Sequence, residues 1–170
     1  VEGSSYRNEI ETFKYDKNDR LINLYWNKQE HVFEYDSKGR LIKITYDNKG
    51  EGYTSVEKFT YHSSGYLSKK VVTDYSGTTT YVYNKNGDVT KFTMASPEDN
   101  VVYEYDITYK KKGQPQNATV LCNGENVSTA EFTYNKDGTM KKLEMISLDG
   151  TTSGFEYTYK NGRIVKEMTT

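Results

Sequence analysis

Few residues in this chain have the types and spacing that catalysis requires. Nucleophilic catalysis needs a serine, cysteine or threonine beside a general base, and the chain has only two histidines, His31 and His62, and one cysteine, Cys122. His62 replaces the aspartate of a repeated turn and His31 opens a strand after a loop, so we interpret both as structural. Cys122 has no histidine near it in the sequence. We interpret it as a small core residue, and a single cysteine excludes an internal disulfide.

The carboxylates do not form the arrangement that glycoside hydrolysis needs, which is two acidic groups facing each other across a sugar. Asp16 and Asp36 occupy equivalent turns, where capping of the backbone already accounts for them. The loops 47–50 and 96–100 offer oxygen ligands for Ca²⁺, but neither has the density of acidic residues of a dedicated site. The sequence therefore predicts no catalytic residue, no cofactor and no metal site.

Aromatic side chains are the remaining candidates for a function. The chain has 17 tyrosines, 6 phenylalanines and a single tryptophan. Exposed rings on a sheet can stack on sugars or hold a peptide, whereas cross-strand ring pairs only stabilise the sheet, by about 0.2–1 kcal/mol each. We select as possible ligand-contact residues those that lie outside the repeat described below and near the connection 47–55, which is expected to be the longest and most mobile: Tyr25, Trp26, Tyr46 and Tyr53.

A repeat provides the elements that must position these residues. Its copies align on seven tyrosines, with a large apolar residue two positions before each and a polar residue between in all copies but one. This alternation predicts a strand with one face turned inward. The aligned tyrosines are Tyr15, Tyr35, Tyr61, Tyr83, Tyr109, Tyr134 and Tyr159.

A tight turn and a second strand follow each tyrosine. In the second copy, Asp36 opens the turn and Gly39 supplies the positive φ that a hairpin connection requires. The first copy has Asp19 at the glycine position, which tolerates this backbone conformation less well. Pro115 begins the return strand of the fifth copy and predicts an edge-like or bulged strand there. Each copy is therefore a hairpin.

Seven hairpins predict an all-β fold, an antiparallel meander of about 14 strands within a single domain, 1–170. Residues 1–9 are polar and are predicted to be an extended or disordered lead-in. A closed barrel of this many strands would enclose more space than side chains can fill. We therefore expect an open, strongly twisted or curled sheet, and the alternative is a flattened barrel or a two-layered wrap.

The second copy, Phe33–Leu41, reads Phe-Glu-Tyr-Asp-Ser-Lys-Gly-Arg-Leu and resembles the YD repeat of the Rhs family, whose core is Tyr-Asp-x-x-Gly-Arg-Leu. The first copy, Tyr15–Leu21, matches this core except at Asp19, and the later copies drift from it. In that family the repeats build a long antiparallel β-strip, which spirals into a shell around a toxin in large members. This chain is too short for such a shell. It is more similar to short YD-repeat proteins of the bacterial envelope, and the family has no catalytic residues to transfer.

Charge and hydropathy narrow the classes of partner. The 23 basic and 24 acidic residues are interspersed and give a net charge of −1, which argues against nucleic acid as a partner. No apolar run is long enough to span a membrane. The chain begins at Val1 without methionine, which suggests a leader that was cleaved or omitted and is compatible with a lipid anchor in the full-length precursor. We therefore expect an extracytoplasmic protein of the periplasm or cell surface, secreted or a lipoprotein.

These observations predict a non-enzymatic cell-envelope β-repeat module that binds or scaffolds, with carbohydrate or peptide as the candidate ligand of its surface aromatics. The alternative is a purely structural strip whose edges and faces pair with other protein chains. A hydrolase with an unrecognised site is the remote alternative.

Overall fold

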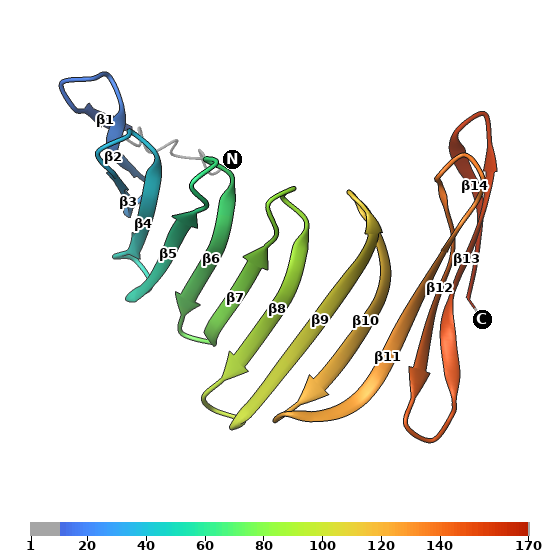
Figure 1. The fold of residues 1–170 in the computed structure, drawn as a ribbon. Coiled ribbons are helices and arrows are strands. Elements are labelled where there is room, and N and C mark those ends of the chain that lie inside the picture. The colour runs from blue at the N-terminus through green and yellow to red at the C-terminus, as the bar shows by residue number, and fades with distance from the viewer. Residues whose placement is uncertain (1–10, 170) are drawn as a thin grey trace, which may run out of the picture.

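The computed structural model describes residues 11–169, so the predicted lead-in at 1–9 lies outside the described residues. One sheet of 14 strands contains all the regular structure, and its strands are hydrogen-bonded in chain order. The sheet curves and twists along its length (Figure 1). The strands are β1 (Thr12–Tyr15), β2 (Leu21–Trp26), β3 (Gln29–Tyr35), β4 (Leu41–Asn48), β5 (Tyr53–Tyr61), β6 (Leu67–Asp74), β7 (Gly77–Tyr83), β8 (Val89–Ser96), β9 (Val101–Lys111), β10 (Gln114–Cys122), β11 (Glu125–Tyr134), β12 (Met140–Ser147), β13 (Thr152–Lys160) and β14 (Arg163–Thr169).

The sheet is a single open layer. Every ladder is antiparallel and joins consecutive strands, and within residues 11–169 each strand contacts only the strands before and after it. The strands β1 and β14 lie at opposite ends and do not pair with each other (Figure 1). The predicted open all-β meander of 14 strands is therefore confirmed, and residues 11–169 form neither a flattened barrel nor a two-layered wrap. No helix within these residues is long and apolar enough to cross a membrane.

Residues that are directly opposite on neighbouring strands share a face of the sheet. The two faces that this register defines differ in composition. One face, here called the aromatic face, carries large apolar side chains: Phe33, Ile44, Tyr46, Tyr81, Phe92, Tyr105, Phe132, Leu143 and Phe155. The other, here called the threonine face, carries Thr45, Thr54, Thr80, Thr93, Thr119, Thr129 and Thr133.

No second layer covers either face, and burial is correspondingly low. Among the described residues, the buried hydrophobic side chains are only Ala118, Val120 and Ala130. They lie together on β10 and β11, where Ala118 pairs with Ala130. The sheet is therefore held by strand pairing and by half-buried aromatic contacts more than by an enclosed core.

The repeated turn is closed by its aspartate. The Asp36 Oδ1 atom accepts hydrogen bonds from the backbone N–H groups of Lys38 and Arg40, both at 2.9 Å, and Oδ2 accepts one from Arg40 Nε at 2.7 Å. The N–H group of Arg40 and its side chain hold the pKa of the Asp36 carboxyl below its usual value, with burial opposing them. Asp16 and Arg20 repeat this arrangement in the first copy.

The glycine position of the turn has positive φ in both of these copies. Gly39 has φ 79° and Asp19 has φ 59°. The aspartate therefore adopts the left-handed conformation that we expected it to tolerate less well. Pro115 lies in an internal strand where the register shifts on both sides of it, so the predicted bulge is present and the edge position is not.

The motif residues also join each hairpin to the next one. The Tyr35 hydroxyl donates to the Leu21 carbonyl at 2.9 Å, and the Arg20 guanidinium lies 4.8 Å from the centre of the Tyr35 ring. The next junction repeats this geometry, with Tyr61 donating to Leu41 at 2.6 Å and Arg40 lying 4.6 Å from the Tyr61 ring. Tyrosine, arginine and leucine of the repeat therefore act across the boundary between two copies.

We expect Tyr61→Phe to lower the free energy of unfolding by about 1 kcal/mol, because one part-buried hydrogen bond is lost and its carbonyl acceptor keeps no equivalent donor. Urea denaturation measures this difference. The matched control is Tyr75→Phe, since the Tyr75 ring is 77% exposed and its hydroxyl makes no hydrogen bond to the described residues. An equal effect of the two substitutions would contradict the role assigned to the repeat tyrosine.

Candidate binding surface

The structure separates the four predicted contact residues into two groups. Trp26 pairs with Gln29, Tyr46 with His31 and Tyr53 with Asn48, and the shared register places Trp26, Tyr46 and Tyr53 on the aromatic face. Tyr25 pairs with Glu30 and lies on the threonine face. A single ligand on one face therefore cannot contact Tyr25 together with the other three.

The connection predicted at 47–55 is shorter than expected. The ladder between β4 and β5 continues through Asp47–Thr54 and Asn48–Tyr53, so only residues 49–52 link the two strands. Asn48 is 5% exposed, and its Oδ1 atom accepts the N–H of Gly50 at 3.1 Å. The prediction that 47–55 is a long loop is wrong, because the strand ladder extends to Asn48 and Tyr53 and Asn48 hydrogen-bonds within the short turn.

Four ring contacts form a continuous row on the aromatic face across β3, β4 and β5. Ring centres are 6.4 Å apart for Phe33 and His31, 4.8 Å for His31 and Tyr46, and 5.7 Å for Tyr46 and Tyr53. The row ends at Tyr75, in the turn after β6, whose ring centre is 5.8 Å from that of Tyr53. We call these five residues the aromatic row.

The aromatic row is most exposed at Tyr75, and its other four members are half-buried. The Tyr75 ring is 77% exposed, and Trp26, at the end of β2 on the same face, is 45% exposed. A hydrogen bond with Tyr53 is the largest cause of the raised pKa of Tyr46, and burial adds to it. Rings that are fixed against one another and open to solvent provide a platform for stacking on a sugar ring or an extended peptide.

Three members of the row, Phe33, His31 and Tyr75, were not among the predicted contact residues. His31 lies inside β3 and pairs with Tyr46, so it does not simply open a strand after a loop. Counting the strand register back from the Asp36–Gly39 turn could have placed His31 opposite Tyr46. Tyr75 is exposed because it lies in a two-residue turn between β6 and β7. The residue composition of this segment alone does not reveal that the turn is so short.

The residues considered for chemistry have structural partners. His62 Nε2 lies 3.0 Å from the Tyr83 carbonyl oxygen, across the junction between two hairpins, and Cys122 is half-buried at the end of β10. Within residues 11–169 no group of three or more histidine, cysteine or acidic side chains could hold a metal ion.

No protein-family model matches the sequence, and no curated protein matches it. Solved structures do resemble the fold. The chain superposes on a crystal structure of TcdB2-TccC3-Cdc42 with a TM-score of 0.52 at 12% identity, covering 93% of this chain and 11% of that chain. A porin-like protein from Bacteroides uniformis matches with a TM-score of 0.47 at 18% identity, covering 83% of this chain and 58% of that chain. The first likeness supports the fold alone, and this chain spans only a small part of that protein.

Proposed function

We propose that the protein is a non-enzymatic binding module of the bacterial cell envelope, located outside the cytoplasm, which contacts carbohydrate or peptide through the aromatic face near Trp26. The observation that carries this proposal is the aromatic row, an ordered series of rings that no other part of residues 11–169 covers. A packed monomer normally hides such rings, and exposed aromatic surface often marks a binding site.

We also propose that the chain is a short YD-repeat protein of the Rhs type. The contacts of the motif residues support this assignment, because tyrosine, aspartate, arginine and leucine each have a defined role in the turn or at the junction of the first copies. Unrelated hairpins with a similar spacing would not form the same hydrogen bond, from a tyrosine hydroxyl to a backbone carbonyl, at successive junctions.

The test is a thermal-shift screen against glycans, peptidoglycan fragments and extended peptides, followed by titration of any ligand found. We expect Trp26→Ala to weaken binding about tenfold while the protein stays folded, because one stacked ring is typically worth on the order of 1–3 kcal/mol. Tyr25→Ala is the matched control, since Tyr25 is the adjacent residue on the opposite face. Equal losses in the two variants, or a Trp26→Ala variant that unfolds, would count against this surface.

Edge pairing with another protein chain is the second candidate function. Within residues 11–169, β1 and β14 each pair along one side only, and exposed edge strands are templates for further pairing. Tyr15 on β1 is 58% exposed and Ile164 on β14 is 54% exposed, although their counterparts at internal junctions are half-buried. A mass that rises with concentration in sedimentation experiments would favour this candidate, and a strict monomer at high concentration would count against it.

A further inference from the structure

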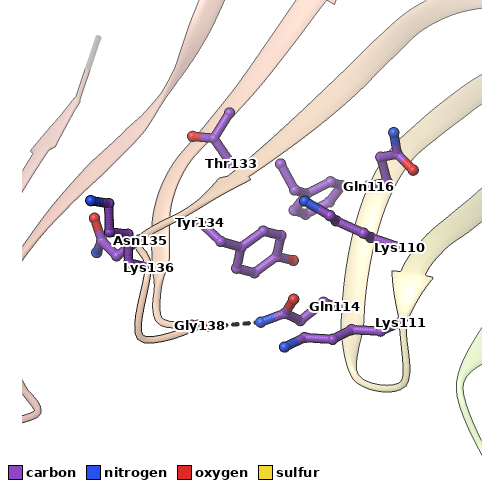
Figure 2. Close-up of a pocket in the computed structure, with 10 residues that line it drawn as sticks. Lys110, Lys111, Gln114, Gln116, Thr133, Tyr134, Asn135, Lys136 and Gly138 are labelled. Carbon is purple, nitrogen blue, oxygen red and sulfur yellow. Dashed lines mark hydrogen bonds between the residues drawn. The ribbon is translucent and has the colours of Figure 1, made fainter.

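The junction between the fifth and sixth repeats contains a pocket of about 540 Å³ on the side of the tight turns. Figure 2 shows Lys110 and Lys111 extending from the end of β9 towards the Tyr134 ring, with Asn135 and Lys136 on the opposite side. The pocket lies on β9 to β11 and the turn after β11, and it is separate from the aromatic row, which lies on β3 to β5 and in the turn after β6. Its lining is Lys110, Lys111, Gln114, Gln116, Phe132, Thr133, Tyr134, Asn135, Lys136 and Gly138.

The fifth copy lacks the aspartate and the arginine that close the turn of the second copy. In the alignment on the repeat tyrosine, Lys110 stands where the second copy has Asp36, and Gln114 stands where it has Arg40. Arg40 covers the ring of the next repeat tyrosine. Gln114 instead donates from Nε2 to the Gly138 carbonyl at 2.9 Å, as Figure 2 shows.

As at the other junctions between hairpins, the strands diverge beside the tight turn. The ladder between β10 and β11 begins at Asn117 and Glu131, so residues 114–116 have no ladder partner on β11. The Tyr134 hydroxyl bridges the gap by donating to the Pro115 carbonyl at 2.8 Å. Cations lie over the rings of Tyr35, Tyr61 and Phe59 in the described part of the chain, and none lies over Tyr134. The ring therefore forms part of the pocket wall.

The charge of the lining has one sign. Three of its ten residues are lysines and none is acidic, although the whole chain has a net charge of only −1. Lys110, Lys111 and Lys136 form no ion pair with any described residue, whereas five other lysines do. The neighbouring turn carboxylate, Asp137, is bound by the N–H and hydroxyl of Thr139. Unpaired ammonium groups around a concave surface favour an anionic ligand.

We propose that this junction pocket binds an acidic saccharide, a sugar ring that carries a carboxylate. The lysines supply the counter-charge, the Phe132 and Tyr134 rings offer a surface for the sugar ring, and the Gln116 amide can bond its hydroxyl groups. Lysines also bind phosphate as point charges, so it is the rings of the lining, and not its charge, that favour a saccharide over inorganic phosphate. The site is independent of the aromatic row, so it stands or falls separately from the proposed function.

The probe is a galacturonic acid trimer, with the neutral galactose trimer as its uncharged counterpart, titrated by calorimetry at low ionic strength. We expect binding of the acidic trimer only, with an affinity that falls as salt is raised from about 20 to about 200 mM. Lys110→Gln with Lys111→Gln should raise Kd about tenfold or more, since hydrogen bonds to charged groups are among the strong ones. The matched control is Lys17→Gln with Lys38→Gln, two lysines in equivalent turns of the first copies.

A second variant gives the fifth copy the turn residues of the second copy, which replaces the Lys110 charge and places an arginine beside the Tyr134 ring. Lys110→Asp with Gln114→Arg restores the pair that closes the second repeat, so it should abolish binding of the acidic trimer while the thermal midpoint stays the same or rises. The proposal is overturned if the acidic trimer does not bind at millimolar concentration, or if both trimers bind equally. Unchanged binding by this second variant, or tighter binding of inorganic phosphate than of the trimer, would also overturn it.

Discussion

Gly154→Ala is expected to release the C-terminal hairpin from the sheet. Gly154 pairs with Glu144 in the middle of the ladder between β12 and β13, and it is buried although it has no side chain. A Cβ atom added there would overlap the Leu143 carbonyl oxygen and lie 3.0 Å from the Glu144 Cα atom. Both are backbone atoms of the neighbouring strand, so they can move only if the ladder opens. We expect a loss of about 2–3 kcal/mol from this overpacking.

The loss should be local, because each strand within residues 11–169 contacts only its sequence neighbours. In such a one-dimensional array, stability is close to a sum of repeat and interface contributions. Amide hydrogen exchange should show β13 and β14 losing protection while β2 to β10 keep theirs. Ser153→Ala is the matched control, since Ser153 is the preceding residue of the same strand and pairs with Met145. Uniform loss of protection over the whole sheet would contradict this description of the fold.

Most of the fold could be predicted because the determinants of each hairpin are local. The Asp36 side chain bonds the turn that follows it, and Gly39 provides the positive φ that the turn requires. Seven such units set the number of strands, and alternation sets the faces. The sequence also argued against a closed barrel, because side chains could not fill one of this size, but it left a flattened barrel or a two-layered wrap as the alternative.

The candidate surface was predicted less well, for two different reasons. Tyr25 and Trp26 are adjacent in β2, so strand alternation alone should have excluded a shared face. The pairing of His31 with Tyr46 depends on the register shift between Glu34 and Tyr35, and a one-residue shift moves a side chain to the other face. The turn signal of Asp36–Gly39 indicates this bulge, so His31 could be assigned to the aromatic face only by counting the register through the turn.

The junction pocket could not be predicted from any one repeat. The fifth copy lacks the aspartate and arginine of the second copy, and the significance of this loss depends on a contact between copies, the arginine of one over the tyrosine of the next. The drift of the later copies from the Rhs-like core was visible in the sequence. The effect of this drift on the contacts between copies was not visible, because the motif contains no information on which residues face each other across the boundary between two copies.

Phe92→Ala is expected to weaken the centre of the sheet. Phe92 lies on the aromatic face of β8, with its ring centre 5.0 Å from that of Tyr81 and 5.5 Å from that of Tyr105. The substitution removes both ring contacts, each worth about 0.5–1.5 kcal/mol, together with half-buried apolar area. We expect a total loss of about 2–3 kcal/mol, which is below the roughly 3–5 kcal/mol found for phenylalanine in enclosed cores.

The lower expected cost follows from the open architecture, because solvent already reaches the aromatic face and a smaller side chain leaves no sealed cavity. Thr93→Ala is the matched control on the threonine face of the same strand, and we expect it to change the unfolding free energy by less than about 0.5 kcal/mol. Urea denaturation measures the difference, and amide exchange should localise the Phe92→Ala effect to β7, β8 and β9. Equal costs on the two faces would mean that strand pairing alone holds the sheet. The aromatic face would then have no structural role to explain its rings, which would strengthen the case that they serve a ligand.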